Sequence, residues 1–184
     1  MKCFILVGPE SSGNHVFCSL FSQLKCGHEP IVGTDLAGWT DGRHKFHSEE
    51  AFEDVWLGRK ELDVRAPFVT SRSVPCGLVM PDIVGFCNVA RKLGFDPLVV
   101  VISRDMNINA MSARHHGHPW PTSRGISHIK ETMRQVRCTV VSYEALVLYK
   151  ELYFDAWLKE HAPEFTCEPK WFNFIKDENK KCVK

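Results

Sequence analysis

Hydrophobic residues follow two alternating patterns along the chain. Short continuous apolar runs, typical of strands buried on both faces of a parallel sheet, occur at 2–7, 67–71, 97–103 and 138–142. Elsewhere apolar residues recur every three or four positions, which predicts helices at 15–24, 82–93, 107–115, 126–137 and 145–161. Strands that alternate with helices predict an α/β fold in three layers, with a central, mostly parallel sheet flanked by helices.

Two stretches lack either pattern. Residues 28–64 carry scattered Gly, Asp, His and Trp, which predicts a long loop with one short helix at 49–57. Residues 116–125 combine Gly, Pro and Trp and are predicted to be loop as well. No repeat or composition shift divides the chain, so we expect one domain over 1–184, with a frayed charged tail at 177–184.

Composition narrows the classes of partner. The 184 residues are 44% hydrophobic and 24% charged, as in ordinary folded domains, and the net charge is +1. No global field favours nucleic acid or an anionic membrane, so neither is an expected partner. No apolar run has the length of a membrane span or a signal-peptide core. Eight cysteines without C-x-x-C spacing predict reduced thiols. The expected location is therefore cytoplasmic, and the oligomeric state is not indicated.

The segment from Gly8 to His15 follows the first predicted strand and opens the first predicted helix. Gly8 and Gly13 allow the backbone to wrap round a phosphate, whose charge is met by amides and by the positive end of the helix. Ser11 and Ser12 add hydroxyl donors. The alternative is an ordinary strand-to-helix turn with a serine cap. The combination of strand, glycine spacing and helix favours the phosphate loop.

This loop lacks the residues that a nucleoside-triphosphatase loop uses. Such loops carry Lys and then Ser or Thr after the second glycine, to neutralise the β- and γ-phosphates and to hold Mg²⁺. Asn14 and His15 occupy those positions here. The sequence therefore argues against a magnesium-dependent kinase or ATPase.

A second candidate anion site follows the strand at 97–103. That strand leads into Arg104 and Asp105, and Ser112 stands eight residues after Arg104. Parallel sheets bind ligands at the carboxyl ends of their strands, so Arg104 is expected beside the phosphate loop. The alternative, favoured when this segment is taken alone, is an arginine that caps a helix or pairs with Asp105.

Three motifs in this order resemble the cytosolic and bacterial sulfotransferase family. They are the loop 8–15, Ser103-Arg104-Asp105 with Ser112, and the strand 138–142 that leads into Tyr143-Glu144-Ala145-Leu146; together they span about residues 2 to 160. The resemblance implies a P-loop-type fold and 3′-phosphoadenosine 5′-phosphosulfate as co-substrate, with no metal required. It also implies transfer of a sulfonate group to a hydroxyl or amine of a small-molecule or glycan acceptor.

The resemblance implies a role for each motif. The loop residues expected to bind the 5′-phosphosulfate end are Ser11, Ser12, Gly13, Asn14 and His15. Arg104 and Ser112 would bind the 3′-phosphate, for which a bidentate guanidinium is suited. Tyr143 would lie near the nucleotide, and Glu144 would be a structural hydrogen-bond partner.

The catalytic groups are less well defined. Glu10 and His15 are the candidate general bases nearest to the loop in the sequence. The family has Lys or Arg where Ser11 stands, and its catalytic histidine would fall near Arg72. There are therefore two alternative functions. One is a non-catalytic nucleotide- or anion-binding module of the same fold, and the other is a degenerate P-loop nucleotide kinase.

Three histidines, His115, His116 and His118, lie within four residues of one another. Imidazoles at such spacing can bind zinc or nickel. No carboxylate or cysteine stands at a useful local spacing, so we interpret the cluster as a polar loop and predict no metal site.

Overall fold

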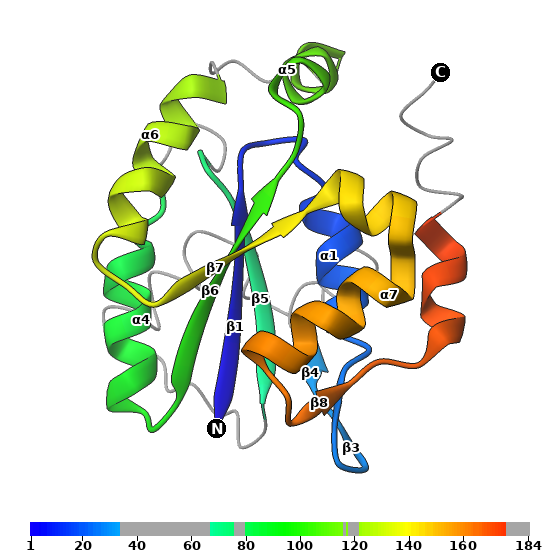
Figure 1. Ribbon diagram of the computed structural model, residues 1–184. Coiled ribbons are helices and arrows are strands. Elements are labelled where there is room, and N and C mark those ends of the chain that lie inside the picture. The colour runs from blue at the N-terminus through cyan, green and yellow to red at the C-terminus, as the bar shows by residue number, and fades with distance from the viewer. Residues whose placement is uncertain (34–66, 76–79, 116, 118–121, 176–184) are drawn as a thin grey trace.

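The computed structural model describes residues 1–33, 67–75, 80–115, 117 and 122–175. Its centre is a five-stranded sheet in the order β4-β5-β1-β6-β7 (Figure 1). The strands are β1 (Lys2–Gly8), β4 (Val32–Gly33), β5 (Phe68–Ser73), β6 (Asp96–Ser103) and β7 (Cys138–Ser142). Each neighbouring pair of strands is parallel. The predicted α/β fold with a mostly parallel central sheet flanked by helices is thus confirmed.

Helices cover both faces of this sheet (Figure 1). One face packs against α1 (Asn14–Phe21) and α7 (Tyr143–His161), and the other against α4 (Ile83–Lys92) and α6 (Thr122–Met133). Another helix of the described chain, α5 (Met106–His115), lies beyond the carboxyl ends of the strands.

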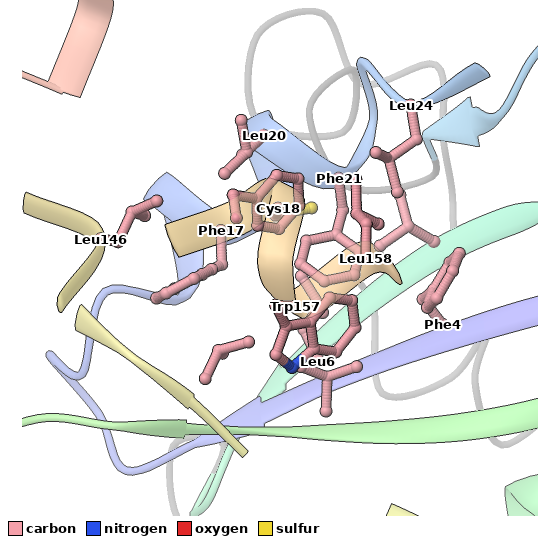
Figure 2. Close-up of a cluster of buried hydrophobic side chains, with 14 of the residues drawn as sticks. Phe4, Leu6, Phe17, Cys18, Leu20, Phe21, Leu24, Leu146, Trp157 and Leu158 are labelled. Carbon is pink, nitrogen blue, oxygen red and sulfur yellow. The ribbon is translucent and has the colours of Figure 1, made fainter. Parts of the chain in front are cut away.

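The central strand β1 explains why its sequence is continuously apolar. Phe4 and Leu6 point into the cluster under α1 and α7, whereas Ile5 and Val7 point into the cluster under α4 and α6. A strand buried on both faces cannot alternate with polar residues. Figure 2 shows the first cluster, in which the rings of Phe21 and Trp157 meet edge to face at 5.4 Å.

The edge strand β7 is covered by side chains of α7. The Ser142 amide donates to the Tyr153 hydroxyl at 2.6 Å, and the Trp157 indole Nε1 donates to the Val140 carbonyl at 3.2 Å. These bonds occupy backbone groups that another chain would otherwise pair with. Within the described residues, no helix has the length and apolar character needed to cross a membrane.

A second, antiparallel sheet was not predicted. It consists of β2 (Lys25–Cys26), β3 (Glu29–Pro30) and β8 (Phe165–Thr166), and a 3-10 helix, η2 (Pro169–Phe174), follows it. Together with β4, these strands show that the predicted loop does not begin at 28. Strands of two residues are too short to display an alternating pattern, which is why the sequence did not reveal them.

Two predicted helix starts were wrong. Residues 122–125 were predicted to be loop, yet α6 begins at Thr122. The start of this helix was missed because Gly125 weakens the helical pattern in the sequence. The structure requires that glycine, since a Cβ there would lie 1.9 Å from the Val74 carbonyl oxygen. α7 begins at Tyr143 rather than Ala145, with the Ser142 hydroxyl accepting from the Ala145 amide as an N-cap. The predicted helix at 49–57 and the tail at 177–184 lie outside the described residues.

The six cysteines in the described part of the chain are all free thiols: Cys3, Cys18, Cys26, Cys87, Cys138 and Cys167. Burial raises the pKa of Cys87 to about 11 and that of Cys167 to about 12. Both side chains are therefore protonated and poorly nucleophilic at neutral pH.

Candidate functional site

The predicted motifs meet at the carboxyl edge of the sheet, where β1 and β6 end side by side. β1 runs into the loop that opens α1, and β6 runs into Arg104 and α5 (Figure 1). In the strand order, the next strand of this sheet after β1, which is β4, lies at one end of the row. The strand after β6, which is β7, lies at the other end. This divergence is the topological switch point at which α/β sheets bind ligands.

The loop after β1 is a tight turn with little free space. The Ser12 amide donates to the Pro9 carbonyl at 3.0 Å, and Ser11 and Gly13 have φ of 65° and 100°. A Cβ on Gly8 would lie 2.2 Å from the Ser12 hydroxyl, and one on Gly13 would lie 2.4 Å from the Tyr143 ring. Both glycines named from the sequence are therefore required by close packing, and Gly13 also by its positive φ.

Two predicted ligand residues turn inward instead. Ser12 and Asn14 are 1% and 7% exposed. The Ser12 hydroxyl donates to Asn14 Oδ1 at 3.3 Å, and Asn14 Nδ2 donates to the Ser73 hydroxyl at 3.0 Å. Asn14, in the position of the missing lysine, thus ties the first turn of α1 to the end of β5. The side chains of Ser12 and Asn14 therefore hold the loop, and the Ser12 amide is bound to the Pro9 carbonyl as well, so these two side chains are not directed at a ligand.

Arg104 lies against the loop, as the strand-end argument predicted. Its Nη1 donates to the Ser11 carbonyl at 2.6 Å, and its guanidinium lies over the Tyr143 ring, 4.5 Å from the ring centre. Tyr143 is 6% exposed and packs on Gly13. One cation, one aromatic ring and one backbone loop therefore form a continuous contact.

The Asp105 carboxylate, one of the alternative partners for Arg104, binds the backbone of α5. The Asp105 carboxylate accepts from the Asn107 and Ile108 amides at 2.9 and 3.0 Å and so caps the start of α5. The Asp105 amide donates to Glu144 Oε1 at 2.8 Å. Glu144 is thus a structural hydrogen-bond partner, linking the end of β6 to the start of α7.

Two residues of this cluster are not predicted from the sequence. Ser73 binds Asn14, and Asn109 is 1% exposed and donates from Nδ2 to the Glu10 carbonyl at 2.9 Å. Ser73 could have been predicted, because it is a polar residue at the carboxyl end of β5, the strand beside β1. No sequence pattern distinguished Asn109, because its partner lies 99 residues away.

The remaining candidates lie around this core. Glu10 is half-buried at the turn, and His15 is exposed in the first turn of α1. Ser112 is half-buried on α5, beyond Asn109. His115 is exposed at the end of α5, whereas His116 and His118 lie outside the described residues.

Arg72, the cation nearest to the position of the family's histidine, points away from this loop. It is 5% exposed and pairs in register with Val7, whose side chain faces α4 and α6. Paired residues of a sheet share a face, so Arg72 faces α4 and α6 as well. The next residue, Ser73, is the one that reaches the loop.

Comparison of the sequence with models of protein families gives no match, and comparison with curated proteins gives none. The interpretation of function therefore depends on the motifs and on how their residues lie in this structure.

Proposed function

We propose that this site binds 3′-phosphoadenosine 5′-phosphosulfate and transfers its sulfonate group to a hydroxyl or amine of a small-molecule or glycan acceptor. The observation that supports this most directly is the contact between Arg104 and the Ser11 carbonyl. Two motifs separated by 93 residues are joined there, a loop suited to one phosphate and a guanidinium suited to another. A nucleotide with phosphates at both its 5′ and 3′ positions matches such a pair.

The loop itself supports anion binding without a metal. Gly13, at the N-cap of α1, makes no side-chain capping bond, and the amides of a first helical turn have no partners within the helix. These amides and the helix dipole attract a phosphate. The strand order, with β1 between β5 and β6, and the loop that follows β1 are the features on which we propose a P-loop-type fold.

The proposed reaction is an in-line displacement at sulfur. The acceptor oxygen or nitrogen forms a bond to sulfur while the bond from sulfur to the bridging phosphate oxygen breaks, and 3′-phosphoadenosine 5′-phosphate leaves. Loop amides would stabilise the charge on the departing phosphate, and His15, if protonated, would add to this. Glu10 and, when neutral, His15 are the candidate general bases that would take the acceptor proton.

The second candidate function is a binding module without catalysis. Asn14 is bound to Ser73, and Ser11 carries no charge, so the loop itself supplies no lysine or arginine to the bridging oxygen. The same site would then bind the nucleotide and leave it intact. A degenerate nucleotide kinase is the third candidate, and Mg²⁺-dependent ATP turnover would be its mark.

Calorimetric titration tests the proposal directly. We expect 3′-phosphoadenosine 5′-phosphate to bind more tightly than ADP or ATP, because only it carries a 3′-phosphate for Arg104. Arg104→Ala should weaken its binding at least about tenfold, as expected for loss of a charged hydrogen bond. Arg114→Ala, on the exposed end of α5, is the matched control and should leave the affinity unchanged.

Equal binding of the three nucleotides, or binding of none, would contradict the two-phosphate site. Where the nucleotide binds selectively, sulfonate transfer from the 5′-phosphosulfate to a panel of hydroxyl and amine acceptors separates the enzyme from the binding module.

A further inference from the structure

The turn at the start of the loop is held in a conformation that its sequence disfavours. The Ser12 amide bonds to the Pro9 carbonyl, so Glu10 and Ser11 are the two central residues. Among the described non-glycine residues, positive φ occurs at Ser11 (65°) and Lys150 (47°), and not at Glu10. Positive φ at the second central residue alone defines a type II turn, which normally has glycine or asparagine there.

A serine in this turn has an easy way to relax. Rotation of the Glu10–Ser11 peptide converts type II into type I, in which both central residues have negative φ. Such a rotation would move the Glu10 carbonyl to the opposite side of the chain. The conformation seen here therefore needs a contact that holds this one peptide.

Side chains from beyond β6 supply that contact. Asn109 Nδ2 donates to the Glu10 carbonyl at 2.9 Å, and Arg104 Nη1 donates to the next carbonyl, that of Ser11, at 2.6 Å. The first bond is made to the peptide that would rotate. Asn109 lies on α5 and is 1% exposed, so the donor is fixed by packing.

We propose that Asn109 is a positioning residue that orients the Glu10–Ser11 peptide for anion binding; this rests on the function proposed above. In a trans peptide the N–H points opposite to the C=O. With the carbonyl held toward α5, the Ser11 N–H faces the other way, and in this proposal it is one of the donors to the bound phosphate. Rotation of the peptide would put a carbonyl oxygen in its place, which repels an anion.

Arg104 and Asn109 then have different tasks. Arg104 is half-buried and can exchange the Ser11 carbonyl for a phosphate of the ligand. Asn109 is buried, acts only through the peptide, and holds the loop whether or not a ligand is present. The site is accordingly built before the nucleotide arrives, which lowers the cost of binding.

The test uses Asn109→Leu, because leucine has the same number of side-chain heavy atoms and the same branching at Cγ but no hydrogen-bond donor. Its affinity for 3′-phosphoadenosine 5′-phosphate should fall about fivefold to tenfold, the effect of one such hydrogen bond. Adding Ser11→Gly should restore the affinity, because glycine favours positive φ at this position. Adding Ser11→Ala instead should give no recovery. A purely structural defect would not distinguish glycine from alanine at Ser11.

A measurement without ligand keeps this inference separate from the proposed function. The nuclear Overhauser effect between the Glu10 Hα and the Ser11 amide proton is strong in type II turns and weak in type I, because the Glu10 ψ differs. It should be strong in the wild type, weak in Asn109→Leu, and strong again with Ser11→Gly.

If the wild type binds none of the nucleotides but the proton contact changes as expected, the proposed function fails while the orientation by Asn109 stands. An unchanged proton contact in Asn109→Leu, or equal rescue by Ser11→Ala, overturns the inference.

Discussion

Thr70 is the clearest case of a single side chain that works against stability. It lies in the middle of β5, is 0% exposed, and its hydroxyl has no hydrogen-bond partner among the residues that the structure describes. Burying an unpaired hydroxyl costs about 1–3 kcal/mol. Thr70→Val keeps the shape and removes that group, so we expect the free energy of unfolding to rise by about 1 kcal/mol, measured by urea denaturation.

The control for this prediction is Thr132→Val. Thr132 is 4% exposed, but its hydroxyl donates to the His128 carbonyl at 3.1 Å. The same substitution there should lower stability or leave it unchanged. Destabilisation by Thr70→Val would mean that its hydroxyl does have a partner in solution.

Individual site residues differ in how far the sequence could predict them. Gly8, Gly13 and Arg104 were found because their positions relative to strand ends carry information. Ser73 and Asn109 were not, because each acts through a contact with a distant segment. Positions within one element follow from periodicity, whereas contacts between elements depend on packing.

α7 contains a break that no glycine or proline marks. Lys150 has φ 47° and ψ −119°, values that a residue with a Cβ adopts only under strain. The part before the break carries Tyr143 to the loop, and the part after it carries Tyr153 and Trp157 to the edge of β7. The residues around Lys150 are good helix formers, so the apolar pattern over 145–161 predicts one uninterrupted helix and gives no sign of this break.

Lys150→Gly should therefore stabilise the protein. Glycine adopts positive φ without the steric penalty, so we expect the free energy of unfolding to rise by about 1 kcal/mol, seen as a higher midpoint in thermal unfolding. Lys159→Gly, in the regular part of the same helix, should lower it by about 1 kcal/mol. If both substitutions destabilise alike, the break at Lys150 is not present in solution.

The architecture of the whole molecule was predictable in outline. Continuous apolar runs identified β1, β5, β6 and β7, and their alternation with helices gave a parallel sheet whose carboxyl edge carries the site. The strand order was not predictable from this pattern, because four apolar strands of similar length can be arranged in several ways. The small sheet was missed as well, since it joins segments from near the two ends of the described chain.

At the amino ends of the strands, opposite the site, a carboxylate links neighbouring segments. Its effect on stability can therefore be measured separately from ligand binding. Asp96, at the start of β6, accepts from Lys2 of β1 at 2.6 Å and lies 3.4 Å from Arg137, next to β7. The hydrogen bond from Lys2, together with these charges, holds the pKa of Asp96 below its ordinary value, against a smaller opposing effect of burial. A carboxyl with a lowered folded-state pKa stabilises the fold above its unfolded pKa, and that contribution is lost as pH falls through the folded value.

Asp96→Asn should consequently lower the urea midpoint at pH 7. The difference from the wild type should shrink as pH falls below about 4, where the unfolded chain binds its proton. The effect should be small and weaker in high salt, because Asp96 is 53% exposed. Asp155→Asn, on the exposed side of α7, serves as the control with a smaller change. Nucleotide affinity should not change in Asp96→Asn, since this carboxylate lies at the far end of the strands from the loop; a parallel loss of affinity would mean that the two edges of the sheet are coupled.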